Sequence, residues 1–589
     1  MAFFWNKKQE SKSEEVTDLV TSLTLDMEDE ELVSTIDTLV SESSKNAEAM
    51  EKLGEDNEKY WKGHQLDPSK FHDHQTPVND NRIFLSTETV IPIMTSRTPE
   101  PTVRLKDAAL REQVKQFLMN LWEVPTDDCI TRDMQAVIEM VARHWMIYRI
   151  GIIKYFYDPE IDGMRTIFVR PPKVIFDKEG TTVDDCRFIG EYADSTVDGL
   201  FEEFPKKEKE ITEVIGKNRG MSKIKYLEFW TDEYVCYKFK NIILEKKKNP
   251  NFDYGDLNGT GKPIFNIFKK ARKPYIVLNL FNLGKSIYDD TSLIEQSKSL
   301  QDSVNKTKRN IADNSSDNGV LAGSGDFIDK KVLEAYTGAP DEKIWIKSGD
   351  VRQALMRLEP KQIAVHTTND LNDSKTEIDN IFGSHSTTRG EVKGSKTLGE
   401  AQLLRTGDMG RIDLMSRALD RVSQEWYTAM LHMLFVFTTT PKEMNSNDEE
   451  GTSLIFDRTQ FIAPETGGLM KIIVKVKPGS AMSIDKDARR AEAMELATGK
   501  LMDPITFYER MDYSNPRKMA ERLFLWSTNP IVLFPELLAQ QQAQEAATAE
   551  AERAVAENEA NANVDKAANT PLPEGTVVNL PTNQPAAAP

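Results

Sequence analysis

The chain of 589 residues offers two places where residue types and spacing could support chemistry. His72 and His74 stand two residues apart with one carboxylate between them. On a strand both imidazoles would point the same way and could share a metal ion. The segment Gly259-Thr-Gly-Lys262 comes closest to a phosphate-binding loop, but Pro263 stands where a Ser or Thr must reach the metal. We interpret the first as an ordinary polar surface and the second as a turn, so we expect no metal and no other cofactor.

Neither the cysteines nor the paired carboxylates indicate catalysis. Cys129, Cys186 and Cys236 are widely separated, which suits a reducing compartment and offers no disulfide framework or zinc site. The pairs Asp127-Asp128 and Asp289-Asp290 are typical of helix starts, where carboxylates favour the positive end of the helix dipole. The sequence also lacks the nucleophile-elbow, zinc-protease and EF-hand motifs. We therefore expect that the protein is not an enzyme.

Three groups of cations are candidates for binding nucleic acid or a neighbouring subunit. We place Lys246–Lys248 and Lys269–Lys273 in loops and interpret them as solvated or inter-subunit charge patches. Arg389, Lys393 and Lys396 lie in a glycine-rich stretch without apolar periodicity, which predicts a flexible loop. Spaced cations without aromatic residues suit weak, sequence-independent contact with a nucleic-acid backbone. On the residues alone, a plain surface loop remains the alternative.

Composition limits the class of protein. The net charge of −19 argues against a sequence-reading DNA-binding protein, although it allows a protein that encloses DNA without gripping it. Residues 1–59 carry 16 acidic and 6 basic residues, which indicates a solvated acidic arm with short amphipathic helices. No apolar run approaches the ~18 residues of a membrane span, so we expect no membrane contact. A length of 589 residues predicts three or four folding units of about 100–200 residues each.

Hydrophobic periodicity predicts a helix-rich α+β protein. We expect an extended, irregular segment over 61–105, because it contains five prolines. Strands are predicted over 150–157, 166–170, 174–176, 188–192, 225–239, 320–322, 343–347 and 452–476. Helices are predicted over 106–148, 291–314, 360–382, 397–437, 491–496, 503–511, 517–525 and from about 534 to 557, before an unordered tail.

Two of these helices stand out. Leu293, Leu300, Val304 and Ile311 form a narrow apolar seam on the helix over 291–314, with polar residues between them apart from one isoleucine. The helix over 397–437 would span roughly 60 Å, so we expect it to cross between domains or to kink near Gly407 and Gly410. We expect His432, within that helix, to be packed rather than catalytic.

The order of these features resembles the portal (head–tail connector) proteins of tailed bacteriophages. The likeness covers roughly residues 75–530. It is carried by Arg149-Ile-Gly-Ile-Ile-Lys-Tyr-Phe-Tyr-Asp158, Arg170-Pro-Pro-Lys-Val-Ile-Phe-Asp177, Phe201-Glu-Glu-Phe-Pro205, Glu228-Phe-Trp-Thr-Asp-Glu233, Pro274-Tyr-Ile-Val-Leu-Asn, Tyr288-Asp-Asp-Thr-Ser-Leu-Ile-Glu-Gln296, Leu300-Gln-Asp-Ser-Val-Asn-Lys306, Ile378-Asp-Asn-Ile-Phe-Gly383, Gly390 and the long helix with Arg411.

The resemblance implies a structural subunit of the virion. Such proteins form a ring, usually a dodecamer, at one capsid vertex, and phage DNA passes through the axial channel during genome packaging and ejection. It also implies assembly in the host cytoplasm. The expected partners are double-stranded DNA bound without sequence specificity, the terminase large subunit, the major capsid protein, and later head–tail adaptor or tail proteins.

The resemblance further implies a portal-type division of this ring-forming chain into wing, stem, clip and crown. The expected regions are 1–74 N-terminal arm, 75–288 wing, 289–314 first stem helix, 315–359 clip, 360–384 second stem helix, 385–396 tunnel loop, 397–480 wing, 481–557 crown and 558–589 disordered tail. It assigns Arg389, Lys393 and Lys396 to channel contact with DNA. We expect the seam of Leu293, Leu300, Val304 and Ile311 to pack between subunits, because a narrow apolar seam is poorly satisfied within one monomer.

Two other readings remain open at this stage. The chain could be a different structural subunit of a virion, such as a baseplate or capsid-associated protein. A nuclease or packaging ATPase is a third possibility, but it would need a P-loop or clustered metal-binding carboxylates, and the sequence has neither.

Overall fold

A computed structural model describes most of the chain as a helix-rich α+β protein, as the sequence predicted. The described residues are 26–67, 69, 77–96, 98–123, 134–160, 162–216, 223–255, 264–316, 320–323, 325–326, 328–336, 343–347, 350–358, 364–384, 410–444, 454–477, 484–511, 513, 516–528 and 535–568. The chain divides into two compact units, Met1–Ser483 and Ile484–Pro589. None of the described helices is both long and apolar enough to cross a membrane.

Two antiparallel sheets form the centre of the first unit. One has five strands in the order β4-β5-β6-β7-β8, and the other has three in the order β3-β2-β9. Their strands are β2 (Gly151–Asp158), β3 (Gly163–Val169), β4 (Val174–Phe176), β5 (Ile189–Ser195), β6 (Ile224–Trp230), β7 (Tyr234–Phe239), β8 (Ile242–Lys248) and β9 (Tyr275–Leu278). The predicted strands of this section are confirmed to within a few residues, because buried β-branched and aromatic residues dominate them.

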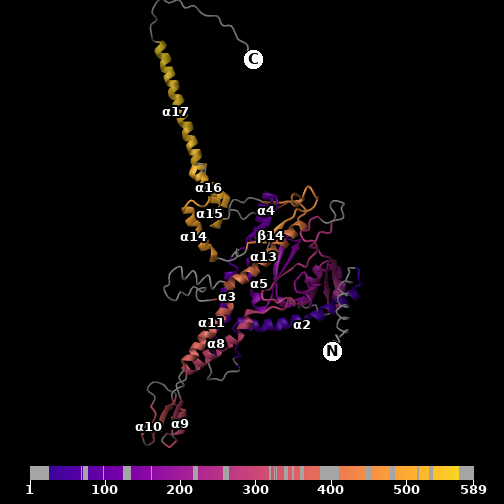
Figure 1. The fold of residues 1–589 in the computed structure, drawn as a ribbon, viewed down its shortest axis with the longest axis vertical. Coiled ribbons are helices and arrows are strands. Elements are labelled where there is room, and N and C mark those ends of the chain that lie inside the picture. Colours follow the sequence, from indigo (N-terminus) through magenta and orange to yellow (C-terminus); the bar gives the residue numbers. More distant parts are fainter. Residues whose placement is uncertain are drawn as a thin grey trace, which may run out of the picture. The chain divides into compact units, whose positions relative to one another are not determined.

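A single long helix replaces the predicted acidic arm of short helices. Helix α2 (Asp29–Trp61) buries Leu32, Ile36 and Leu39 in the same core cluster as the strands of the five-stranded sheet (Figure 1). At Gly54 the helix approaches α5 (Met134–Tyr148) so closely that a Cβ would lie 1.9 Å from the Tyr148 ring. The acids of α2 occupy its outer face, so this arm is solvated on one side only.

A second correction concerns residues 61–105, which were predicted to be extended. Helix α3 (Arg82–Met94) lies there, begins with Asn81 accepting a hydrogen bond from the Phe84 N–H at 3.2 Å, and contains Pro92 in its last turn. It buries Ile83, Val90, Ile91 and Met94, so tertiary packing outweighs the cost of the proline.

The first unit also contains small two-stranded sheets with neighbouring helices. A two-stranded sheet pairs β1 (Pro101–Arg104) with β14 (Ile473–Val476). A second pairs β12 (Lys442–Met444) with β13 (Leu454–Phe456). Helices α4 (Ala108–Glu123) and α13 (Gly410–Phe437) pack against the first of these sheets. The first part of the predicted long helix, 397–409 with Gly407, lies outside the described residues.

The paired helices α8 (Leu293–Ser316) and α11 (Val365–Phe382) flank a small segment in the chain. This segment contains α9 (Lys330–Glu334), α10 (Val351–Ala354) and a two-stranded sheet of β10 (Val320–Gly323) and β11 (Leu355–Leu358). The strand predicted at 320–322 is confirmed. Residues 343–347 form no strand, and β11 was not predicted.

The second unit is helical. Its described elements are α14 (Ile484–Thr498), α15 (Pro504–Arg510), α16 (Pro516–Thr528) and α17 (Pro535–Ala568). The helices predicted in this region are confirmed. Helix α17 continues about eleven residues beyond the predicted end near 557, because its alanine- and glutamate-rich sequence favours helix without needing a buried face.

Candidate functional site in the paired helices

The two helices α8 and α11 lie side by side and run antiparallel (Figure 1). Their direction follows from two shared contacts. Lys308 of α8 and Lys375 of α11 both pair with Asp80, whereas Gln301 and Asp379 both contact Arg82. Residue numbers therefore rise along one helix as they fall along the other.

Helix α11 has few apolar residues and buries three of them, whereas Val365 at its start is exposed. Leu371, Ile378 and Phe382 are 8%, 0% and 0% exposed. The helix ends at Gly383, which adopts a left-handed φ of 75° that a side chain would strain. The Ser384 N–H donates to the carbonyl of Asp379 at 3.0 Å, so the last turn is closed by the chain that follows it.

Helix α8 buries polar side chains as well as apolar ones. Ser297, Gln301 and Asn305 recur every four residues and are fully buried. The Gln301 Oε1 accepts hydrogen bonds from the N–H groups of Arg82 and Ile83, at 3.0 and 3.2 Å. The Gln301 Nε2 donates to the Asp80 carbonyl at 2.6 Å, and the Asn305 Oδ1 accepts from the Asp80 N–H at 3.0 Å. These contacts seat the start of α3 on the middle of α8.

We call residues Asp80–Ile83 the wedge, because they contact both paired helices. The Asp80 Oδ2 lies 2.8 Å from Lys308 Nζ and 2.7 Å from Lys375 Nζ. Arg82 donates two hydrogen bonds to Asp379, at 3.0 and 2.5 Å, in the bidentate geometry that arginine favours. Burial opposes ionisation of Asp80, but its contacts with the two lysines prevail and lower its pKa below the ordinary value of 3.8.

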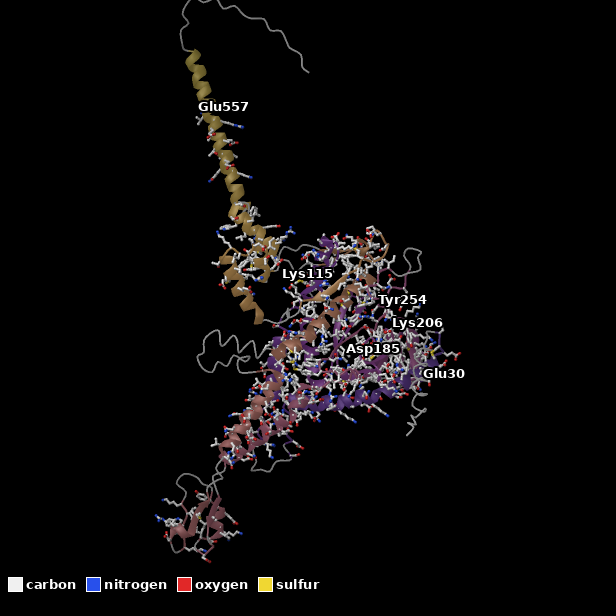
Figure 2. The ribbon with its side chains drawn as sticks, viewed as in Figure 1. Glu30, Lys115, Asp185, Lys206, Tyr254 and Glu557 are labelled. Carbon is white, nitrogen blue, oxygen red and sulfur yellow. The ribbon has the colours of Figure 1, made fainter. Side chains whose placement is uncertain are left out.

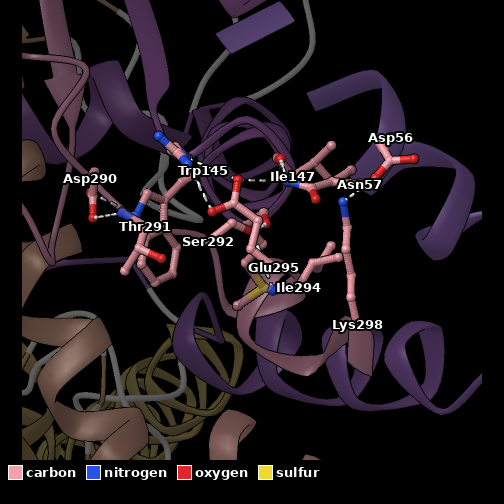
Figure 3. Close-up of polar contacts among 12 residues, drawn as sticks. Asp56, Asn57, Trp145, Ile147, Asp290, Thr291, Ser292, Ile294, Glu295 and Lys298 are labelled. Atoms are coloured by element: carbon pink, nitrogen blue, oxygen red, sulfur yellow. Dashed lines mark hydrogen bonds and ion pairs between the residues drawn. The ribbon is translucent and has the colours of Figure 1, made fainter. Parts of the chain in front are cut away.

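A second polar network anchors the first turns of α8 to α2 and α5 (Figure 3). The Ser292 hydroxyl donates to the Met146 carbonyl and accepts from the Ile294 N–H at 3.1 Å. Asn57 donates to the Ile147 carbonyl at 2.6 Å, and Lys298 pairs with Asp56 of α2. Ser292 therefore caps α8 and attaches it to α5 at the same time.

Arg149 completes this anchor from a strained backbone. Its φ of 71° lies in the left-handed region, which costs a non-glycine residue roughly 1–3 kcal/mol. Its Nε lies 2.9 Å and its Nη2 3.0 Å from the two carboxylate oxygens of Glu295. This backbone conformation lets the chain turn from α5 into β2, and it directs the Arg149 guanidinium toward Glu295 in the first turn of α8.

Asp290 was expected to cap a helix, and that expectation is wrong. Its carboxylate accepts from the N–H groups of Leu280, Phe281 and Thr291 at 2.9, 3.0 and 2.7 Å, and from the Trp145 indole at 3.4 Å. It organises the loop before α8, while Ser292 caps the helix. Burial raises the pKa of Asp290 despite these hydrogen bonds.

The structure divides the predicted seam into two pairs. Leu293 and Val304 are 1% and 0% exposed and are therefore covered within the chain. Leu300 and Ile311 are only half-buried. Only the second pair thus has surface left for a neighbouring subunit, and its packing role stays a prediction.

Several predicted residues lie outside the described part of the chain. They include the loop cations Arg389, Lys393 and Lys396, the histidine pair and the glycine–lysine turn. The other basic clusters are described and differ from expectation only in part, since Lys269–Lys273 lies in a loop as predicted. Lys246–Lys248 belong to strand β8, where Lys246 pairs with Asp29 at 3.0 Å. Lys273 is 2% exposed and pairs with Asp232, because a buried ammonium needs a carboxylate.

Several buried titratable groups in the described residues form structural contacts. No group of three or more His, Cys, Asp or Glu residues there could hold a metal ion. His432 is packed, as predicted, with Nδ1 accepting from the Ile267 N–H at 3.2 Å and Nε2 2.8 Å from the Asn251 carbonyl. Lys154 lies between Glu191 and Glu228 at 2.8 and 2.7 Å, inside the core between the two sheets.

Sequence reasoning missed the wedge and its partners. The signal available was the spacing of Ser297, Gln301 and Asn305, which puts three small or amide side chains on one helix face. Amides at such positions can satisfy backbone groups of another segment. Nothing local identified that segment, since Asp80 is more than 200 residues away in the sequence.

Comparison with known proteins adds little at the level of sequence. No protein-family model matches the chain, and no curated protein matches it. A similar solved chain comes from a structure described as the neck of an empty gene transfer agent (GTA) particle computed with C6 symmetry. The match covers 73% of this chain and 90% of that one, at 10% sequence identity and a TM-score of 0.37. A similarity of that size carries no argument about function.

Proposed function

We propose that the chain is a portal subunit of a tailed-phage-like particle, which forms a ring at one capsid vertex. DNA passes through the ring during packaging and ejection. The packaging terminase docks on the ring first, and head–tail adaptor or tail proteins replace it. The major capsid protein surrounds the ring.

The observation that carries this proposal is the anchored pair α8 and α11. Two antiparallel helices leave a mixed α/β body, are separated in the chain by a small segment, and are clamped by the wedge. Leu300 and Ile311 lie on nearly the same side of α8, and both are half-buried. A helix pair with a rigid base and a partly uncovered apolar edge suits a stem that packs against the next copy in a closed ring.

The charges of α11 support a channel that DNA can slide through. Asp370, Asp373 and Glu377 are exposed, recur at intervals of three and four residues and so share one helix face. They form no ion pair with another described residue. An acidic channel wall would repel phosphates and keep DNA from adhering.

Electron microscopy of the purified full-length chain tests the proposal. We expect rings with a continuous axial channel and a mass of about twelve subunits by light scattering. A chain that stayed monomeric at every salt concentration would contradict the proposal. A closed assembly without a channel would favour another structural subunit of a virion.

We also propose a structural rather than an enzymatic role. The buried ionisable groups named above are paired or hydrogen-bonded to other parts of the fold. ATP hydrolysis by the purified chain alone, above the level of a mock preparation, would contradict this part of the proposal.

A further inference from the structure

The outer face of the β1–β14 sheet concentrates cations on an acidic protein. The strands alternate, with Pro101, Val103, Val474 and Val476 buried against α4 and α13 and the residues between them exposed. Thr102 lies opposite Lys475, and Arg104 lies opposite Ile473. Arg104 and Lys475 are therefore diagonal neighbours, about 7–8 Å apart. Lys106 and Lys471 extend the exposed row beyond the two strands.

We call Arg104, Lys106, Lys471 and Lys475 the cationic face. Among the described residues, none of the four forms an ion pair. The nearby acids are already engaged. Glu100 lies 3.1 Å from Lys115 and 3.9 Å from Lys477, and the Asp107 carboxylate accepts from the first N–H groups of α4 at 2.8 and 3.1 Å. These four cations are thus without an ion-pair partner within the described structure, although the whole chain carries a net charge of −19.

The side chains of the cationic face suit a polyanion as the binding partner. Arg104 and Lys475 lie on adjacent strands of one exposed face, and Lys106 and Lys471 stand two residues beyond the strand ends on the same side of the pattern. Thr102 adds a hydroxyl, and the one exposed apolar side chain, Ile473, is 38% exposed. A protein partner would ordinarily require an apolar centre, which this face lacks. No amide or aromatic side chain stands among the four cations to read a base.

We infer that the cationic face binds the phosphate backbone of double-stranded DNA without sequence specificity. The site is separate from the glycine-rich loop with Arg389, Lys393 and Lys396. The inference rests on the β1–β14 geometry and does not require ring formation, so it stands or falls independently of the portal proposal. If both hold, the ring has a second DNA contact on the body of each subunit.

Fluorescence anisotropy with a random-sequence 30-base-pair duplex tests the inference on the full-length protein. In the variant R104Q/K106Q/K471Q/K475Q we expect about a 100-fold loss of affinity at 0.1 M salt. The slope of log K against log salt should become shallower by up to about 3.6, because four phosphate contacts each contribute about 0.9. The milder R104Q/K475Q should lose about half of that slope.

A matched control removes four other exposed cations, K206Q/K209Q/K223Q/K225Q. Figure 2 places Lys206 well away from Lys115, which pairs with Glu100 beside the cationic face. We expect this control to bind DNA nearly as the unaltered protein does. Equal weakening by both fourfold variants would overturn the inference, because binding would then follow total charge. So would unchanged binding by the first variant, or a change in its oligomeric state alone, which would make the face a subunit contact. Circular dichroism confirms that each variant is folded.

Discussion

At the scale of single residues, Asp80 links three segments that are distant in sequence. It lies in the wedge and pairs with one lysine of α8 and one of α11. Its side chain is 23% exposed, so solvent screens these pairs only in part. Together with the Arg82–Asp379 ion pair, Asp80 connects the start of α3 to both paired helices.

We expect Asp80→Asn to lower the free energy of unfolding by about 2 kcal/mol, because two lysines lose a charged partner. The pKa of Asp80 is lowered in the folded state, so its contribution is present at neutral pH and is lost as pH falls through the folded value. The variant should therefore lose stability at pH 7 and show a weaker acid dependence. Chemical denaturation at several pH values measures both, with Asp373→Asn, on the exposed face of α11, as the control. Equal stability of the two variants would contradict this role for Asp80.

His432 affects the stability of the fold as a buried base, whereas Asp80 does so as an acid. Burial lowers its pKa from 6.5 to about 4, with the contact to the Asn251 carbonyl opposing the shift. The folded state therefore keeps the ring neutral, and the stability that this provides is lost as pH falls from about 6.5 to about 4. The loss amounts to about 3 kcal/mol.

In His432→Gln we expect a smaller decrease of unfolding free energy over that pH range. The amide can still donate to the Asn251 carbonyl but does not titrate. Part of the slope should remain, because burial also lowers the pKa of His144 to about 4. Denaturation curves at pH 7, 5.5 and 4.5 check the prediction. An unchanged slope would mean that His432 does not titrate on unfolding.

At the scale of elements, the local pattern predicted the existence of most helices and strands. Helices α8, α15 and α16 and strands β2–β7 lie within a few residues of their predicted positions, whereas α11 begins five residues later and α14 seven residues earlier than predicted. Two of the failures have one cause. Prolines suggested an irregular segment where α3 lies, and acids suggested a solvated arm where α2 lies. In both elements burial of one face outweighs local propensity.

Helix α8 leads to a prediction about assembly. We expect L300D/I311D to prevent ring formation while leaving the subunit folded, since both side chains are half-buried and a charge there would face the apolar edge of a neighbour. The control S299D/N310D places the same charges about 100° around the helix. Sedimentation velocity separates ring from monomer. Rings formed by the first variant would remove Leu300 and Ile311 from the subunit interface.

At the scale of the whole molecule, the proposed role depends on DNA moving through an assembly of many copies. The acidic face of α11 suits a sliding surface, whereas the loop cations Arg389, Lys393 and Lys396 suit a weak holding contact. In this proposal the acidic face of α11 acts while DNA moves through the ring, and the loop cations act once the DNA has stopped.

We expect Arg389→Ala, Lys393→Ala and Lys396→Ala together to reduce DNA retention in filled heads without preventing ring assembly. Quantifying packaged DNA by nuclease protection measures retention, and electron microscopy verifies the rings. Normal retention in complete rings would exclude these cations from the mechanism.

The sequence by itself determined the helix-rich α+β fold class and most of the local elements, because amphipathic periodicity, turn residues and composition act over a few residues. It predicted the paired helices and the apolar seam on α8. Only the tertiary structure decided that Gln301 and Asn305 of α8 bind the wedge. It also decided that Arg104 and Lys475 share one surface. Arg82 and Asp379, like Arg104 and Lys475, are about 300 to 370 residues apart in the chain. Their contacts arise from the packing of whole elements, which no local pattern encodes.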